Sequence, residues 1–170
     1  MALEIAAGKC RRPSFSGIRQ DVPVAELEAL GLEPCFVGTY NGFEDLDDVL
    51  AACDRDVLLL GCGPAGSDVL SLAAMGARDE ILTDLGQEED AVHNHNGVDW
   101  YYSDSWSWGF VGEGTGVTRN SCDVDDEPDS ALRMCWHTGG GQMNNGYRCG
   151  DEFPFGNNYV RVIYHRSGGL

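Results

Sequence analysis

The stretch Tyr159-Val160-Arg161-Val162-Ile163-Tyr164-His165 (YVRVIYH) lies near the C-terminus. Residues 159, 161, 163 and 165 alternate with residues 160, 162 and 164, so in an extended chain the two sets would lie on opposite faces. A period of two residues is typical of a half-buried β-strand. Other short segments in the second half of the chain, which is rich in Gly, Asn, Trp and Cys, are also strand candidates. They are residues 98–102, 106–111, 117–120, 132–137 and 146–149. So many short strands predict a domain dominated by antiparallel pairing.

Helices are expected only in the first half of the chain. Residues 43–53 (FEDLDDVLAAC) carry apolar side chains at helical spacing and acidic ones in the first turns, where the helix dipole favours them. Residues 23–30 (PVAELEAL) predict a shorter helix with Pro in its first turn and Gly31 after its end. The strand candidates of this half are residues 36–40, 57–60 and 81–85, while residues 69–75 fit either a strand or a helix.

These elements predict an α+β fold, mainly an antiparallel β sheet or sandwich with one or two N-terminal helices, stapled by disulfides. The chain of 170 residues is long enough to bury a core of its own. We expect residues 1–20 to form a flexible N-terminal arm and residues 21–170 a single domain. An acidic, polar stretch at residues 86–91 marks an alternative internal boundary.

The cysteines indicate an oxidising compartment. The chain has seven of them and no CxxC pair, so structural disulfides are favoured over a zinc ribbon or a thioredoxin-like dithiol. The alternative is a reducing compartment in which the cysteines are small buried apolar residues. Because seven is odd, one thiol must stay free or bond another chain. We expect this thiol to be Cys10, in a polar segment beside Arg11, Arg12 and Pro13.

Charge and hydropathy narrow the partners and the location. The net charge of −17 argues against binding nucleic acid or anionic membrane surfaces, since their phosphates would be repelled. No run of eighteen apolar residues is present, so no membrane span is expected. Residues 1–7 are too short for the apolar region of a signal peptide and include Glu4. We therefore expect an extracellular or cell-surface protein whose leader has been removed.

The stretch VLLLGCGPAG at residues 57–66 matches the fingerprint of dinucleotide-binding enzymes, with Gly61, Gly63 and Gly66 at the required spacing. Asp84 stands about where a ribose-binding acid would lie. The strand and helix alternation of such a domain does not continue beyond Asp84, however. The alternative is a Gly/Pro turn between two core strands, with Cys62 in a disulfide.

Two segments contain candidate metal ligands. Residues 123–129 (DVDDEPD) gather hard oxygen donors but lack the Gly and Glu of an EF-hand loop, so a non-EF calcium site is the hypothesis. Its ligands would be Asp123, Asp125, Asp126 and Asp129. His93 and His95, completed by His137 or an aspartate, are a weaker candidate for a transition-metal site. The alternatives are a solvated acidic loop and solvated histidines.

Aromatic side chains are concentrated at residues 100–110 (WYYSDSWSWGF). A planar row of rings beside polar groups is typical of sugar-binding surfaces, since rings stack on sugar C–H faces and polar groups bond the hydroxyls. The alternative is that these rings form the hydrophobic core. The predicted glycan-binding residues are Trp100, Tyr101, Tyr102, Asp104, Trp106 and Trp108.

Three short patterns carry a resemblance to a known module: SWGF at residues 107–110, CWHT at residues 135–138 and GYRCG at residues 146–150. The chain from Cys35 onward is similar to a cysteine-rich module of exported proteins from myxobacteria and their relatives. The resemblance implies export and disulfides, and it implies nothing about mechanism. Cys10 would lie outside the module. Six cysteines then remain to pair in any of fifteen ways, namely Cys35, Cys53, Cys62, Cys122, Cys135 and Cys149.

These patterns favour a non-enzymatic extracellular recognition module that is glycan-binding or adhesin-like, with calcium as an optional cofactor. No GxSxG motif or recognisable Cys/His pair indicates nucleophilic catalysis. One alternative is a structural subunit of a surface layer or fibre that self-associates through Cys10. The other is an FAD- or NAD-dependent oxidoreductase that uses the GCGPAG stretch.

Overall fold

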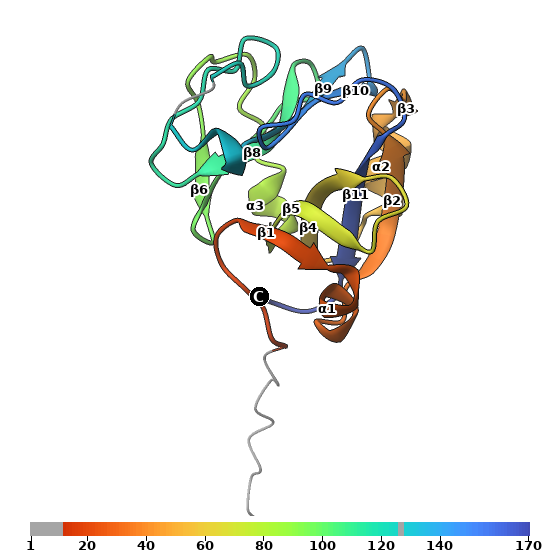
Figure 1. Ribbon diagram of the computed structural model, residues 1–170. Helices are drawn as coiled ribbons and strands as arrows, with labels where there is room; N and C mark the ends of the chain where they lie inside the picture. Colours follow the sequence, from red (N-terminus) through yellow and green to blue (C-terminus); the bar gives the residue numbers. More distant parts are fainter. Residues whose placement is uncertain (1–11, 126–127) are drawn as a thin grey trace, which may run out of the picture.

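The computed structural model describes residues 12–125 and 128–170, which form two stacked antiparallel sheets (Figure 1). The first sheet has the strand order β1 (Arg19–Pro23), β5 (Val69–Ala77), β4 (Val57–Pro64), β11 (Tyr159–Arg166) and β2 (Glu33–Thr39). The second has the order β3 (Glu44–Asp45), β10 (Gln142–Cys149), β9 (Met134–Gly139), β8 (Ser107–Gly112), β7 (Val98–Tyr102) and β6 (His93–His95). The predicted α+β fold of mainly antiparallel strands is confirmed.

The main core lies between the two sheets. In β11, Ile163 faces this core, while Val162 and Tyr164 pack into a second apolar cluster on the other face of the first sheet. The predicted alternation of this strand is therefore confirmed. The disulfide between Cys62 of β4 and Cys149 of β10 joins the two sheets through the core.

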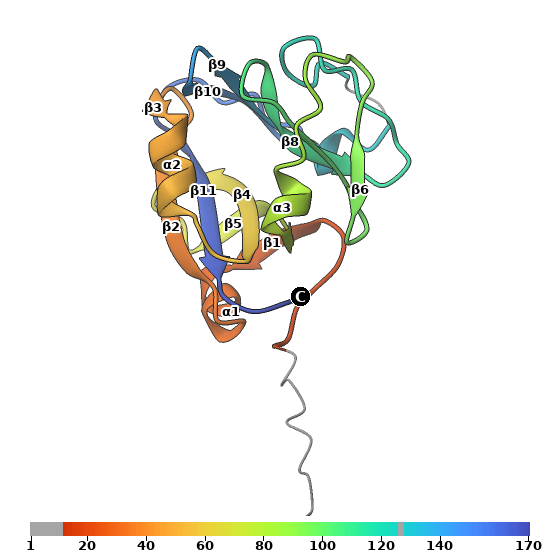
Figure 2. The same ribbon diagram turned by 180° about the vertical axis from the view of Figure 1, so that it is seen from behind.

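The outer face of the first sheet is covered by α1 (Val24–Ala29) and by the segment that precedes β1 (Figures 1 and 2). Leu27 of α1 and Phe15 are buried in the cluster on this face. Gly31, with φ of 76°, ends α1 in a left-handed turn that favours glycine. The predicted flexible arm is therefore wrong from Phe15 onward, because burial of its ring and the pairing of β1 with β5 hold this segment.

The predicted helix at residues 43–53 is present as α2 (Leu46–Ala52), preceded by the short strand β3. The side chain of Asp45 caps it by accepting a hydrogen bond from the Asp48 amide. Leu46 and Val49 face the main core, and the disulfide between Cys35 and Cys53 ties the end of the helix to β2.

Two strand predictions are wrong. Residues 81–85 were expected as a strand, but Ile81 ends α3 (Arg78–Ile81), and the residues after it form a turn in which Asp84 makes an isolated bridge to Tyr102. Arg78 fixes this turn, because its guanidinium donates to the carbonyls of Leu50 and Cys53. Residues 117–120 belong to a loop held by Arg119, whose side chain is buried. No helix of the described residues is long and apolar enough to cross a membrane.

All six cysteines predicted to form disulfides do so, in the pairs Cys35–Cys53, Cys62–Cys149 and Cys122–Cys135. Cys10 lies outside the described residues. The third pair ties the long loop after β8 to β9. This loop also contains the 3-10 turn η1 (Ser130–Leu132).

Buried arginine side chains hold the loops in place through hydrogen bonds to loop carbonyls. In the described part of the chain, five arginines have fully buried side chains, and each donates to backbone carbonyls of the loops around it. Arg166, for example, donates to the carbonyls of Pro13 and Leu30, and Arg119 donates to that of Gly86. A buried guanidinium is costly unless its donors are satisfied, so these contacts fix the loops in place. The five are Arg119, Arg133, Arg148, Arg161 and Arg166.

Candidate functional site

Most of the predicted glycan-binding aromatic residues are buried. Trp100, Tyr101 and Trp108 have no exposed surface, and Tyr102 is also buried. The central strands β7 and β8 are covered by the first sheet on one face and by loops on the other. Tyr101 lies under those loops, where its hydroxyl donates to the Met134 carbonyl at 2.7 Å. The prediction of an exposed glycan-binding row is therefore wrong for these four residues.

Asp104 and Trp106 lie in the turn between β7 and β8 and keep access to solvent. Asp104 is exposed, and Trp106 is half-buried. Trp106 therefore remains a candidate for contact with a ligand.

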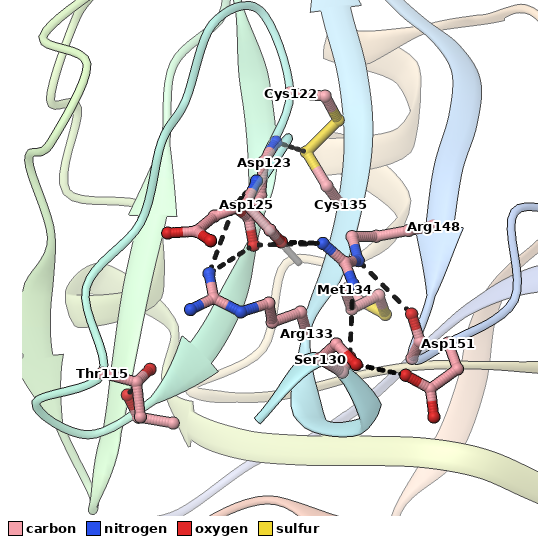
Figure 3. A network of polar contacts seen from close by, with 12 residues as sticks. Thr115, Cys122, Asp123, Asp125, Ser130, Arg133, Met134, Cys135, Arg148 and Asp151 are labelled. Atoms are coloured by element: carbon pink, nitrogen blue, oxygen red, sulfur yellow. Dashed lines mark hydrogen bonds and ion pairs between the residues drawn. A yellow bond between two sulfur atoms is a disulfide. The ribbon is translucent and has the colours of Figure 1, made fainter. Parts of the chain in front are cut away.

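The predicted calcium loop is held by an internal ion pair (Figure 3). Asp123 is fully buried, and its carboxylate accepts hydrogen bonds from Nη1 of Arg133 at 3.0 and 3.2 Å. The guanidinium of Arg148 lies 3.9 Å from the same carboxylate. Burial raises the pKa of Asp123, while both guanidinium groups oppose that rise. Since its oxygens face arginine, the prediction of Asp123 as a calcium ligand is wrong.

The other predicted ligands do not form a cluster. Asp125 belongs to the same network, in which its amide donates to Asp123 Oδ1 and its carbonyl accepts from Arg148. Asp129 precedes η1 with a φ of 57°. Asp126 lies outside the described residues. Within residues 12–125 and 128–170, no group of three or more His, Cys, Asp or Glu side chains is placed to hold a metal ion.

The histidines of the second candidate metal site do not come together. His93 pairs with Glu80, and Nε2 of His95 accepts a hydrogen bond from the Ala77 amide. His137 lies on β9, which β7 and β8 separate from the strand of the other two. The prediction that these three histidines share a metal is wrong.

The GCGPAG stretch forms part of a β-hairpin. Gly61 and Gly63 lie inside β4, and Gly66 lies in the turn that leads to β5. A Cβ on Gly61 would lie 2.9 Å from the Leu72 carbonyl, so this glycine permits close approach of a neighbouring strand. Asp84 forms a β-bridge with Tyr102. The dinucleotide-binding alternative is wrong, because no helix N-terminus follows the glycines within this hairpin to receive a pyrophosphate.

A groove lies across the second sheet, where β9 and β10 meet the surrounding loops. It consists of two adjoining hollows of about 380 and 430 Å³, which share His137 and Asn145. The first hollow is lined by Phe43, Ser105, Trp106, Ser121, Thr138 and Asn144, besides the shared pair. The second is lined by Asn41, Tyr147, Phe153, Pro154 and Phe155, among others. We call this surface the aromatic groove.

Aromatic rings line both hollows of the aromatic groove and are accessible to a ligand. Phe155 is 89 % exposed, Phe43 is 67 % exposed and Phe153 is 38 % exposed. The ring of Tyr147 meets those of His137 and Phe153 edge to face, with centroids 5.6 and 5.5 Å apart. Large exposed rings gathered around one concave surface mark a contact site.

Contacts with Arg119 and Thr138 hold Trp106 in position. The guanidinium carbon of Arg119 lies 5.5 Å from its ring centroid, a cation–π contact. The hydroxyl of Thr138 accepts a hydrogen bond from the Trp106 amide at 3.0 Å and donates one to the Ser103 carbonyl. The indole is therefore positioned before any ligand arrives.

Polar side chains of the aromatic groove keep their hydrogen-bonding capacity. The side-chain amides of Asn41, Asn144 and Asn145 make no hydrogen bond to any group in the described part of the chain, and neither does the His137 imidazole. Burial lowers the pKa of His137, which favours its neutral form. A neutral imidazole and three amides offer both donors and acceptors to a ligand.

The side chains that line the aromatic groove are uncharged at neutral pH, although the whole chain carries a net charge of −17. Charged groups lie close to the lining. The carboxylate of Glu44 is paired with Arg161 at 2.7 Å, and the guanidinium groups of Arg119 and Arg148 lie 5.5 and 5.0 Å from the ring centroids of Trp106 and Phe153. The groove therefore suits a neutral, polar ligand with apolar faces.

Among the groove residues, sequence reasoning named only Trp106 as a glycan-binding residue and only His137 as a metal ligand. The lining comes from five separate segments, at residues 40–43, 105–106, 121, 137–147 and 153–156. Phe153-Pro154-Phe155 was the available signal, because two aromatic residues around a proline in a Gly/Asn-rich loop are poorly suited to a core strand.

Comparisons of the chain with protein-family models, with curated proteins and with solved structures give no match.

Proposed function

We propose that this protein is a non-enzymatic recognition module that binds neutral glycans through the aromatic groove. The observation that carries the proposal is the combination of exposed rings with unpaired amide and imidazole groups on one uncharged concave surface. Sugars present both C–H faces that stack on rings and hydroxyls that donate and accept hydrogen bonds. This pairing of an apolar lining with a few polar groups is how ligand pockets obtain affinity and orientation.

The charge distribution supports a neutral ligand. An acidic polysaccharide would approach a protein of net charge −17 against repulsion, and the lining offers it no cation. The guanidinium groups near the groove are already committed. Arg119 donates to the carbonyls of Gly86 and Glu88, and Arg161 is paired with Glu44.

The disulfides support a location outside the cytoplasm. Three of them in one small domain are typical of an oxidising compartment. We therefore propose an extracellular or cell-surface role, in agreement with the resemblance to an exported cysteine-rich module. An adhesin-like role follows if the glycan belongs to another cell.

A glycan array that contains neutral and acidic glycans tests the proposal, with the Trp106→Ala variant beside the unaltered protein. Loss of the indole should weaken binding about fivefold, since stacking on one ring contributes ~1 kcal/mol. Val37→Ala is the matched control, because Val37 is 60 % exposed on β2 and does not line the groove. Absence of glycan binding by the unaltered protein, or equal binding by the Trp106→Ala variant, would contradict the proposal.

A further inference from the structure

We infer that the aromatic groove binds a linear glycan chain along its length, with separate sugar units in the two hollows. This inference rests on the proposed function and adds the form of the ligand. The two hollows adjoin at His137 and Asn145, and each has aromatic rings of its own. A surface built for one terminal sugar needs only one such hollow.

The dimensions fit more than one sugar unit. Each hollow, at about 380 or 430 Å³, is by itself within the range of pockets that hold a small ligand, ~300–1,000 Å³. Neither hollow is enclosed, so a chain can extend beyond the groove at both ends. An internal segment of a polymer can therefore bind without threading.

The rings of the two hollows are carried by different loops. Phe43 and Trp106 line the first hollow, and Tyr147, Phe153 and Phe155 line the second. Removal of a ring in one hollow should therefore leave the contacts in the other hollow intact. Each hollow then contributes its own share of the affinity for a long ligand.

The loops that carry these rings are already fixed. Arg161 donates to the carbonyls of Thr39 and Gly42, which flank the loop before Phe43. Arg148 lies 5.0 Å from the ring centroid of Phe153. A preorganised surface loses less conformational entropy on binding, so each added sugar contact is converted into affinity.

The shared side chains suggest how the two units are bridged. Asn145 is exposed, and its amide is unpaired within the described part of the chain. His137 is half-buried beside it, with its ring held edge-on by Tyr147. Both can hydrogen-bond sugars on either side of the point where the hollows meet.

Isothermal titration with neutral oligosaccharides of one to six units tests the inference. Cello-, xylo-, manno- and chito-oligosaccharides serve as probes, and any of the four can report the effect. With the probe series that binds, affinity should rise at least about tenfold between one and four units, as the second hollow becomes occupied. Phe155→Ala removes a ring of the second hollow and should weaken binding of the hexasaccharide about tenfold. Val37→Ala is again the control.

The outcomes separate the two proposals. Equal affinity for one and six units, or a Phe155→Ala variant that binds the hexasaccharide as tightly as the unaltered protein, would overturn the two-hollow inference and leave glycan recognition standing. Failure of the unaltered protein to bind any of the four series or any polysaccharide on the array would overturn the proposed function itself. Phe155 is 89 % exposed, so its replacement should not disturb folding.

Discussion

The outer face of the second sheet has a covered half and an open half. Over the covered half, the loop after β8 closes on Tyr101 and Cys135 and is held by the Cys122–Cys135 disulfide and the Asp123–Arg133 ion pair (Figure 3). Over the open half, His137 and Tyr147 face the aromatic groove. The same strand, β9, contributes Cys135 to one half and His137 to the other.

The two halves differ in where their polar groups find partners. In the covered half, charged groups are fully buried and bonded to one another and to backbone carbonyls. In the open half, amides and an imidazole beside exposed rings have no hydrogen-bond partner among residues 12–125 and 128–170. Substitutions in the covered half should therefore change stability, and those in the open half should change binding.

The largest effect is expected from Arg133→Ala in the covered half. Removal of this guanidinium leaves the buried carboxylate of Asp123 without its closest partner. Breaking a buried ion pair in this way costs about 3–5 kcal/mol of unfolding free energy. Urea denaturation followed by tryptophan fluorescence measures the change.

The matched control replaces both partners, as Asp123→Leu with Arg133→Met. Since no uncompensated pair member remains, the double variant should recover most of the lost stability. Equal destabilisation of the single and double variants would show that the ion pair is not what holds the loop.

A smaller effect is expected from removal of the Cys122–Cys135 disulfide by Cys122→Ala with Cys135→Ala. The bond closes a loop with a sequence separation of 13 residues, so its loss should cost about 3 kcal/mol through the greater entropy of the unfolded chain. Thermal unfolding measures the loss. Glycan binding below the melting temperature should persist, and its disappearance would show that the covered half shapes the groove.

The next prediction concerns how the stability of the fold depends on pH. Burial lowers the pKa of His137, as well as those of His95 and His165, below the ordinary value of 6.5. The unfolded chain then binds protons before the folded one does, so stability is complete above pH 6.5 and declines as the pH falls towards the lowered values. Melting temperatures measured across this window should decline less steeply for the His137→Gln variant. An unchanged slope would contradict the role of His137.

The smallest effect on stability is expected from Phe155→Ala in the open half. This ring is almost entirely exposed, so the free energy of unfolding should change by less than about 0.5 kcal/mol. Urea denaturation measures it, alongside the titration described above. A large loss of stability would mean that the ring serves the fold rather than a ligand.

Local patterns were enough to predict much of the fold. The alternation at residues 159–165 and the apolar spacing at residues 43–53 depend on neighbours in sequence, and both elements are present as β11 and α2. The number and spacing of the cysteines likewise predicted disulfides, although not their pairing. The strand predicted at residues 81–85 is wrong, because Arg78 contacts a distant segment and starts the short helix α3, which ends at Ile81 and leads into a turn.

Only the tertiary structure decided which side of each element meets solvent. From sequence alone, Trp100 and Trp108 could belong to a sugar-binding row. In the structure the first sheet, whose strands are distant from them in sequence, covers both rings. The buried arginines carry no local signal, since a guanidinium is buried only where the packed chain supplies acceptors for its donors, as the Pro13 and Leu30 carbonyls do for Arg166. The aromatic groove is decided in the same way, because its lining joins five segments that only the packed sheets bring together.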